Sequence, residues 1–260
     1  MKQSSRSASF DQNLAAQTNR KAGNTPALIL LIALLLLYIC SVKVQTGLLS
    51  LLFPSIQQLT HSRKTLLAMT GEHIALTLLA SLLATFAGVL LGIGVTREEG
   101  RDFQVLVLRL NSFIQTFPPS AVIILAYPAL GFGWKPALLA LFLYSLFPIL
   151  GNTVVGFESV DPGIKDSAKG MGMKPLQQLW IAEFPQAWPM ILTGIRHSYI
   201  LNLGTAAIAA VIGGGGLGTI IISGLTLRNS ALVLSGTIVI TLLAFIGEQV
   251  FLLLSRLTRS

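Results

Sequence analysis

The sequence predicts an all-α membrane protein with six transmembrane helices. Hydrophobic residues make up 53% of its 260 residues and charged residues only 11%, whereas a typical soluble domain carries about 25% charged residues. The apolar residues lie in repeated stretches, and a stretch of about 20 is long enough to cross the hydrocarbon core of a bilayer. No polar stretch between them has the size of a soluble domain, so we expect one compact membrane domain.

The first 70 residues divide into a polar tail, an apolar span and a mixed connection. Residues 1–25 are rich in Ser, Gln and Asn and are predicted to form a mobile cytoplasmic tail. The apolar run at 26–42 is long and lacks a convincing small-residue cleavage site, so we interpret it as a membrane anchor instead of a signal peptide. Residues 43–70 contain a weak apolar patch at 48–53 and are expected to form an external connection with a short interfacial helix.

The second span, at 72–95, opens the predicted core domain, residues 71–257. Thr70 precedes it as a possible helix cap, because a threonine oxygen can accept a hydrogen bond from a free N–H of the first turn. Gly88 and Gly92 lie about one turn apart in this span, and this spacing lets two helix backbones approach closely. Close packing is therefore the predicted role of the two glycines.

The third span, at 106–130, follows a short charged loop at 96–102 and contains three prolines, Pro118, Pro119 and Pro128. Proline removes a backbone hydrogen bond and kinks a helix. Such a defect is tolerated in a membrane where neighbouring helices or water satisfy the freed carbonyl. We therefore expect one kinked helix here.

The fourth span, at 137–155, contains Pro148 and follows an external turn in which Trp134 is expected at the membrane interface, as aromatic residues prefer. The fifth span is predicted at 188–212 and the sixth at 231–254. An even number of spans places both termini on the same side of the membrane.

A run of glycines, residues 213–218, follows the fifth span. It formally matches the dinucleotide-binding pattern G-x-G-x-x-G, but it follows a membrane span instead of a strand of a βαβ unit. We therefore attribute the match to chance. Two interpretations remain open: the run is a hinge or gate at the external end of the helix, or its glycines permit tight packing.

The distribution of basic residues predicts the orientation. The six-span topology places 13 of the 18 basic residues on the side of the termini and of the polar segment at 160–185, which the positive-inside rule assigns to the cytoplasm. The net charge of +8 does not indicate nucleic-acid binding, because the basic residues form short clusters without interleaved aromatic residues. The basic residues on the opposite side are Lys43, Arg63, Lys64, Lys135 and Arg228.

The polar segment at 160–185 is the most informative stretch of the chain, because it is long, patterned and suited to water in a protein that is otherwise largely apolar. Asp161 is predicted to cap a short helix at 164–169, and Pro162 suits the first turn of that helix. The segment is therefore expected to begin with a helix that projects from the membrane.

The second half of this segment is predicted to reverse direction. Gly170 and Gly172 are expected to break the first helix, because glycine adopts backbone conformations that other residues avoid. A second short helix follows at 175–183 and is expected to end at Pro185. The result is a helix-turn-helix projection suited to contact another protein.

Other motifs argue against enzyme chemistry. The phosphate-binding pattern G-x-x-x-x-G-K-[S/T] is absent, so nucleotide-driven work would need a separate polypeptide. The zinc-binding pattern H-E-x-x-H is also absent, and the three histidines are scattered. The single cysteine, Cys40, lies in an apolar run and is interpreted as a small hydrophobic residue.

Two charged residues lie inside predicted spans, where charge is costly and often functional. Arg196 lies about two turns into the fifth span, and Glu248 lies at a similar depth in the sixth. One hypothesis is that they form an ion pair that joins the two helices. The alternative, which is the commoner situation, is that each extends separately to the cytoplasmic interface.

The polar segment resembles the EAA signature of inner-membrane permeases of bacterial ABC importers: E-A-A, three residues, G, nine residues, I-x-L-P. The spacing agrees throughout, with Asp for Glu, Ser for the first Ala, Ala for Ile and Phe for Leu. The resemblance implies the type I (MetI-like) importer fold and a coupling helix that fits a groove of an ATPase subunit. The implied coupling residues are Asp166, Ser167, Ala168, Gly170, Gly172, Ala182, Phe184 and Pro185.

A narrower resemblance extends over about residues 65–255. Stretches at 131–137, 141–150 and 160–162 are similar to the permeases of importers for glycine betaine, choline and related osmoprotectants. Gly151 is a departure, since relatives often carry arginine before the Asn-Thr that follows. The resemblance therefore implies an osmoprotectant permease, without a role for a charge at this position.

This resemblance implies a complex in the bacterial inner membrane, with no nucleic-acid partner. A second permease copy or paralogue would complete an alternating-access path, a periplasmic or lipid-anchored binding protein would deliver the substrate, and ATPase subunits would hold ATP and Mg²⁺. No cofactor or metal is expected on this chain. The third to fifth spans are expected to line the path, where aromatic faces could hold a quaternary ammonium group; the candidates are Phe117, Tyr127, Tyr144 and Asn202.

Three alternatives remain beside this hypothesis. The first is a permease for methionine or another amino acid, because the glycine run after the fifth span occurs in that type as well. The second is a membrane subunit whose projection binds a partner without transport. The third, an enzyme acting on lipid, is disfavoured because no nucleophile or metal set is recognisable.

Overall fold

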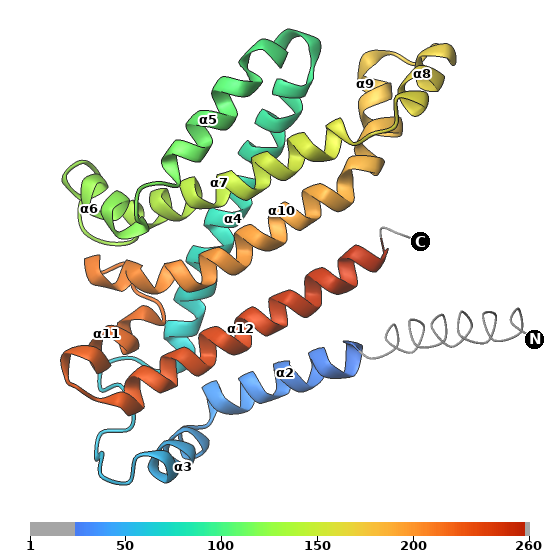
Figure 1. Cartoon of the computed structure of the whole chain (residues 1–260). Helices are drawn as coiled ribbons and strands as arrows, with labels where there is room; N and C mark the ends of the chain where they lie inside the picture. Colours follow the sequence, from blue (N-terminus) through green and yellow to red (C-terminus); the bar gives the residue numbers. More distant parts are fainter. Residues whose placement is uncertain (1–23, 258–260) are drawn as a thin grey trace, which may run out of the picture.

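The computed structural model describes residues 24–257, which form helices joined by turns and by a longer loop at 53–65, and contain no strand (Figure 1). Four helical segments in this range are long and apolar enough to cross a membrane: α4 (Leu66–Thr96), α7 (Trp134–Glu158), the continuous segment Pro175–Ile212 and α12 (Ser230–Leu257). Two bent helix pairs raise the number to six if each pair counts as one span. The predicted all-α membrane fold is confirmed, while nearly all of the predicted tail lies outside the described residues.

The first bent pair consists of α2 (Asn24–Cys40) and α3 (Val42–Leu52), which meet at an angle of 91°. Ser41 separates them in an extended conformation, and its hydroxyl accepts a hydrogen bond from the N–H of Val44 at 3.4 Å. This bond stabilises a new helix start, because it satisfies one of the free N–H groups of the first turn. The short interfacial helix expected within residues 43–70 is therefore α3, which begins directly after α2.

The third span is broken instead of kinked, which corrects the expectation of one helix at 106–130. A 3₁₀ helix, η1 (Glu98–Phe103), leads into α5 (Gln104–Ile114), and α6 (Pro119–Leu130) then continues at 93° to them. Pro118 adopts an extended conformation, with φ −61° and ψ 142°, because the residue before a proline avoids the helical region. The consecutive prolines therefore end one helix and start another.

The two glycines of the second span bring α4 and α7 together. A Cβ atom added at Gly88 would lie 2.8 Å from Cγ2 of Ile149, and one added at Gly92 would lie 2.5 Å from Cγ2 of Thr153. Because packed interiors have no room for such contacts, larger residues at either position would push the helices apart. The structure therefore supports the predicted close packing.

The helix after the polar segment is longer than predicted. Four pieces follow one another without interruption: α9 (Pro175–Gln177), the π-helical turn η2 (Gln178–Glu183), α10 (Phe184–Thr205) and the 3₁₀ helix η3 (Ala206–Ile212). The expectation that Pro185 ends a short helix is therefore wrong. A proline ring crowds the carbonyl of the preceding turn, and the wider π turn directly before Pro185 accommodates it, so the helix continues.

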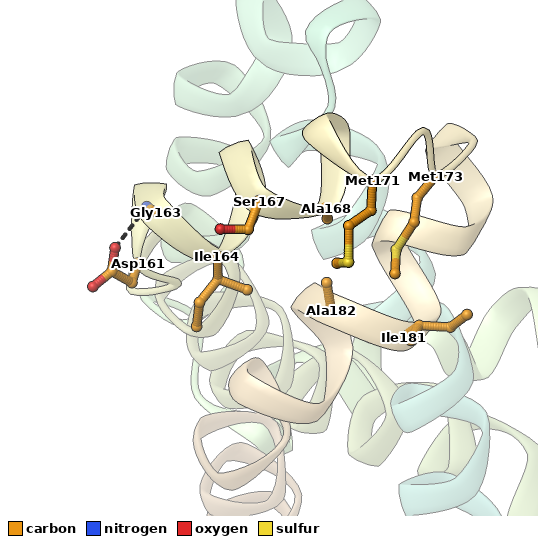
Figure 2. A pocket seen from close by; sticks show the side chains of 9 residues that line it. All are labelled: Asp161, Gly163, Ile164, Ser167, Ala168, Met171, Met173, Ile181 and Ala182. Atoms are coloured by element: carbon orange, nitrogen blue, oxygen red, sulfur yellow. Dashed lines mark hydrogen bonds between the residues drawn. The ribbon is translucent and has the colours of Figure 1, made fainter.

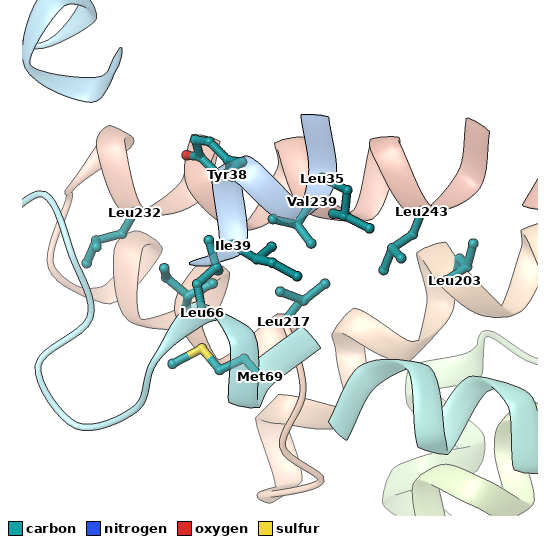
Figure 3. Close-up of a cluster of buried hydrophobic side chains, with 11 residues drawn as sticks. Leu35, Tyr38, Ile39, Leu66, Met69, Leu203, Leu217, Leu232, Val239 and Leu243 are labelled. Atoms are coloured by element: carbon teal, nitrogen blue, oxygen red, sulfur yellow. The ribbon is translucent and has the colours of Figure 1, made fainter. Parts of the chain in front are cut away.

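One short helix was not predicted, α11 (Gly218–Thr226), between the glycine run and α12. Its apolar stretch is too short to resemble a membrane span. It packs on α12 around a cluster of buried side chains to which α2, α4 and α10 also contribute (Figure 3). The cluster consists of Leu35, Tyr38, Ile39, Leu66, Met69, Leu203, Leu217, Ile220, Leu232, Val239 and Leu243.

The glycine run forms a tightly packed turn between η3 and α11. The N–H of Gly216 donates a hydrogen bond to the Glu72 carboxylate at 3.0 Å, and a Cβ on Gly218 would collide with the backbone carbonyl of Ala207. The structure therefore supports the close-packing interpretation of the run. Positive φ angles, which favour glycine, occur at Gly213, Gly215 and Gly216.

The helix ends define two faces of the molecule. The start of α2, the end of α12 and the projecting helices α8 (Pro162–Gly170) and α9 lie toward one end in Figure 1, whereas α3, α6 and α11 lie toward the other. We refer to residues 160–185 as the α8–α9 segment. It projects past the ends of α7 and α10 (Figure 1).

Candidate functional site

α8 is held at its start and along its length by local hydrogen bonds. The Asp161 carboxylate accepts a hydrogen bond from the N–H of Gly163 at 2.7 Å, and Pro162 occupies the first turn, as predicted. The Lys165 ammonium group donates to the backbone carbonyl of Phe157 at 3.2 Å. These bonds fix the angle at which α8 leaves the end of α7.

A left-handed glycine ends α8. The N–H of Met173 donates to the Ala168 carbonyl at 3.2 Å, and the N–H of Gly172 donates to the Lys169 carbonyl at 2.9 Å. This pair of bonds is the Schellman motif, which requires a left-handed residue just past the helix end. Gly172 supplies it with φ +74°. Gly170, by contrast, is the last residue of α8, so the helix ends one residue later than predicted and Gly172 makes the left-handed turn without it.

The turn into α9 is fixed by two glutamine side chains. The backbone N–H of Lys174 donates to Oε1 of Gln177 at 2.9 Å, and the amide of Gln178 donates to the Met173 carbonyl at 2.7 Å. The first bond gives a partner to an N–H at the start of α9, and the second ties η2 to the backbone of the turn. The α8–α9 segment is therefore a defined projection instead of a loose loop.

An open groove of about 520 Å³ runs along the α8–α9 segment, between α8 and the π turn η2 (Figure 2). Its walls are mostly apolar, and the Met171 side chain is 69% exposed. Flexible methionine side chains adapt to the shape of a partner. The groove is lined by Asp161, Gly163, Ile164, Ser167, Ala168, Met171, Met173, Ile181 and Ala182.

The structure does not bring all eight predicted coupling residues to one surface. Phe184 packs in a row with Trp180 and Trp188, with ring centroids 5.0 Å and 5.6 Å away, and thus anchors the segment internally. Three of the eight line the groove, namely Ser167, Ala168 and Ala182. Four others are exposed on the segment, namely Asp166, Gly170, Gly172 and Pro185.

One interaction at the base of the segment was missed by sequence reasoning. Nη1 and Nη2 of Arg97, just past the end of α4, donate to the two carboxylate oxygens of Glu183 in η2 at 3.1 Å and 2.9 Å. The guanidinium also lies over the Phe157 ring, 5.2 Å from its centroid. One feature of the sequence could have indicated this interaction. The variable position of the signature, between Ala182 and Phe184, holds an acidic residue, Glu183, among aromatic residues.

The four candidate residues for a substrate path do not converge within one chain. Phe117 and Tyr127 are exposed, whereas Tyr144 and Asn202 are buried. The Asn202 amide donates hydrogen bonds to the hydroxyls of Ser81 in α4 and Ser145 in α7. Asn202 therefore joins three helices in this structure, and the role of all four residues in a path stays a prediction.

The two membrane-embedded charges form an ion pair. Nε of Arg196 in α10 donates to one carboxylate oxygen of Glu248 in α12 at 2.7 Å, and Nη2 contacts the other oxygen. Gly247 lies beside this pair, and a Cβ there would collide with the ring of Tyr199. The pairing hypothesis is thus supported, because the close approach of α10 and α12 places the two side chains within reach.

Other ionisable residues are spread over the fold. Nε2 of His73 lies 3.0 Å from the Leu203 carbonyl oxygen in the interior, while His61 lies in the loop before α4. Within residues 24–257, no three His, Cys, Asp or Glu side chains are grouped so that they could hold a metal ion.

Comparison with known proteins identifies relatives along most of the chain. The chain is 39% identical over 192 residues to the choline transport system permease protein OpuBB of Bacillus subtilis (strain 168), which covers 74% of this chain and 87% of that protein. It is also 37% identical over 186 residues to the osmoprotectant import permease protein OsmW of Salmonella typhimurium, covering 70% and 86% respectively.

Solved structures share the fold. The MetNI methionine ABC transporter in an inward-facing conformation aligns with a TM-score of 0.68 at 17% identity, covering 74% of this chain and 95% of that chain. An amino acid ABC transporter with histidines aligns with a TM-score of 0.63 at 20% identity, covering 74% and 92%. Residues 84–260 match the model of the family described as binding-protein-dependent transport system inner membrane component. The chain is therefore a multi-pass inner-membrane protein that belongs to this family.

Proposed function

We propose that this chain is the permease subunit of an ATP-driven importer that moves a small osmoprotectant, such as glycine betaine or choline, across the inner membrane. The observation that carries the proposal is the α8–α9 segment, a projection with a fixed turn and a groove. Its exposed apolar side chains suit burial against a partner protein. The side chains of Met171, Leu176 and Ile181 are 69%, 70% and 61% exposed.

The partner of this surface is an ATPase subunit, which holds ATP and Mg²⁺ on its own chain. The segment is continuous with α10 through η2, so a displacement of α8 and α9 acts directly on a membrane-spanning helix. A helix transmits such a displacement because its backbone hydrogen bonds make it stiff. ATP binding between two ATPases would thus reorient the helices that line the path.

The α8–α9 segment and both termini face the cytoplasm in this proposal. Figure 1 places the start of α2 and the end of α12 at the same end of the molecule as the segment. The excess of basic residues on this side supports the assignment through the positive-inside rule. The opposite end, with α6 and α11, would receive the substrate from a periplasmic or lipid-anchored binding protein.

The choice of an osmoprotectant rests on the relatives. OpuBB and OsmW are named as permeases for choline and for osmoprotectants, whereas the methionine and amino-acid transporters share only the fold at 17% and 20% identity. A quaternary ammonium group binds well to aromatic faces. Phe117 and Tyr127 are exposed in the single chain and would line a path completed by a second permease copy or paralogue.

The proposal is tested with the permease, its ATPase and its binding protein in proteoliposomes. We expect ATP-dependent uptake of labelled glycine betaine or choline that excess methionine does not reduce. Uptake blocked by methionine would favour an amino-acid importer. Binding of the ATPase without uptake of any of these solutes would favour a membrane subunit that does not transport.

The projection itself is tested by substitutions on its surface. Leu176→Asp places a charge in the exposed apolar surface and should abolish ATPase binding, because an unpaired charge at an interface is costly. Leu82→Asn is the control, because it also places a polar group on an exposed leucine but lies on α4, within the membrane span, where Leu82 is 66% exposed. It should leave ATPase binding unchanged. Equal ATPase binding by Leu176→Asp and the unchanged chain would exclude this surface as the docking site.

A further inference from the structure

The base of the α8–α9 segment is attached to a helix that is distant in sequence. Arg97 follows α4, and Glu183 closes the π turn η2 before α10. Two parallel hydrogen bonds join them, at 3.1 Å and 2.9 Å, in the fork geometry that gives Arg–carboxylate pairs both strength and direction. The Glu183 side chain is only 8% exposed, so Arg97 is the cation that balances a buried carboxylate.

The surroundings favour this pair at this point. Arg97 lies just past the carboxyl end of α4, where the helix dipole attracts a positive charge. Its guanidinium lies over Phe157 at the end of α7, an additional attraction between a cation and an aromatic face. Phe157 in turn contacts the ring of Phe184 at the start of α10, at 6.4 Å. Three long helices therefore meet at a single ion pair.

The ion pair between Arg97 and Glu183 differs from the other attachments of the α8–α9 segment. Along the chain, α8 follows α7 and η2 continues into α10, and Lys165 adds a hydrogen bond to the end of α7. None of these bonds reaches α4, which otherwise meets the base of the segment through apolar packing of Val89 and Ile93. The bond between Arg97 and Glu183 joins α4 directly to the turn through which α8 and α9 act on α10.

We propose that Arg97 and Glu183 are positioning residues that make a displacement of the α8–α9 segment move α4 together with α10. The inference rests on the proposed function, in which an ATPase displaces this segment. The pair contacts neither substrate nor nucleotide, and its effect is on the yield of transport from each ATP. Without it, only packing and contacts further along the helices would join α4 to the moving segment, so α4 would follow η2 less closely and hydrolysis would be partly uncoupled from uptake.

The test measures solute imported per ATP hydrolysed in proteoliposomes that contain the full complex. Arg97→Gln and Glu183→Gln should each lower this ratio about fivefold or more, the lower range of coupling between sites in proteins. Arg97→Lys keeps the charge but loses the fork, and should retain part of the ratio. Arg101→Gln, an exposed neighbour in η1, is the matched control and should equal the unchanged protein. Ratios for Arg97→Gln and Glu183→Gln equal to that of Arg101→Gln would overturn the proposal.

A second measurement separates coupling from mere folding and requires no transport. In a Cys40→Ser background, spin labels are placed at Glu99 in η1 and Lys169 in α8, which are both exposed. With Arg97 present, the distance between the labels should stay the same when ATP is trapped in the complex. In the Arg97→Gln variant, the distance between the labels should change on ATP trapping, or its distribution should broaden. Identical distances in both proteins, with and without ATP, would refute the inference.

The two measurements also distinguish the failure of the inference from that of the proposed function. If the unchanged complex imports no osmoprotectant, the proposed function fails, while the label distances still report whether α4 follows the segment. If the complex imports the solute and the Arg97 and Glu183 variants match the Arg101 control, only the inference fails.

Discussion

The side-chain amide of Gln115 donates a hydrogen bond to the backbone carbonyl of Tyr144 at 3.1 Å. Pro148 lies four residues after Tyr144 in α7 and has no N–H, so this carbonyl lacks its helical partner. Gln115 lies in the break between α5 and α6 and replaces the missing donor. The expectation that a neighbouring helix satisfies a carbonyl freed by proline thus has a specific example here.

This relationship predicts a dependence between two substitutions. Gln115→Ala should lower the stability of the protein by about 1–3 kcal/mol, the cost of an unsatisfied buried carbonyl. In a Pro148→Ala background the loss should be much smaller, because the introduced alanine supplies the backbone N–H that proline lacks. Thermal unfolding of the four purified proteins measures the coupling. The same loss in both backgrounds would show that Gln115 acts in another way.

Gly172 and Gly170 should respond differently to alanine. Gly172 has φ +74° and no neighbour within 4 Å of an added Cβ, so Gly172→Ala carries backbone strain of about 1–2 kcal/mol and no clash. We expect weaker binding of the ATPase subunit, with Gly172→Asn less affected because asparagine tolerates this conformation. Gly170→Ala should leave the turn itself intact and so weaken ATPase binding less than Gly172→Ala, since Gly170 is helical and has open space. Equal effects at both positions would argue against the Schellman turn.

Gly218 and Gly151 form a second contrasting pair. A Cβ at Gly218 would overlap the Ala207 carbonyl, so Gly218→Ala should separate η3 from α11 and destabilise the protein by about 1–3 kcal/mol, the usual cost of overpacking. Gly151 lies in α7 with nothing within 4 Å of an added Cβ, and Gly151→Ala should be neutral or stabilising. Thermal unfolding of both variants is the measurement. A tolerated alanine at position 218 would contradict the packing described for the glycine run.

The ion pair between Arg196 and Glu248 should behave as a unit. Arg196→Leu or Glu248→Leu alone leaves one charge in a membrane helix, at a cost of about 2–3 kcal/mol. The double substitution should recover much of the loss, because no unpaired charge remains. Yield and thermal stability in detergent are measured for the two single variants and the double variant. A double variant as unstable as the sum of the single variants would show that the two residues act independently.

The loop before α4 should loosen in mild acid. Burial lowers the pKa of His61 below its ordinary value of 6.5, and the nearby Arg63 adds to this effect. The ring nitrogen Nδ1 accepts hydrogen bonds from the N–H groups of Arg63 and Lys64, which require it unprotonated. Because the unfolded loop binds the proton more tightly, the contribution of His61 is present above about pH 6.5 and is lost as the pH falls through the lower, folded pKa.

Hydrogen exchange of residues 60–65 as a function of pH measures this effect. In acid, these amides should exchange faster than the intrinsic pH dependence of amide exchange predicts. His61→Asn should remove this additional pH dependence. An unchanged extra dependence in His61→Asn would assign the effect to another group.

The membrane helices could be predicted because the bilayer imposes length and composition locally. The predicted second, fourth and sixth spans lie inside α4, α7 and α12, whose bounds extend beyond them by a few residues. The cap predicted at Thr70 is wrong, because α4 begins earlier, with Thr65 as its cap. The cap at Asp161 and the turn at Gly172 were also predictable, because both depend on side chains or dihedral angles within a few residues.

The features that were missed depend on neighbours distant in sequence. α11 is short, and its position follows from packing on α12. The helix passes Pro185 because the preceding turn widens, which no local pattern reveals. Arg97 and Glu183 are separated by 86 residues, and nothing in either local sequence specifies the partner.

The sequence by itself determined that this protein lies in a membrane, where its long apolar helices are and where its polar projection lies, because the cost of burying polar groups in lipid acts on each stretch independently. The tertiary structure decided which charges pair, which glycines are indispensable and how the projection is attached to the membrane helices. Those outcomes depend on distances of a few ångströms between helices, and such distances arise only when the whole chain is packed.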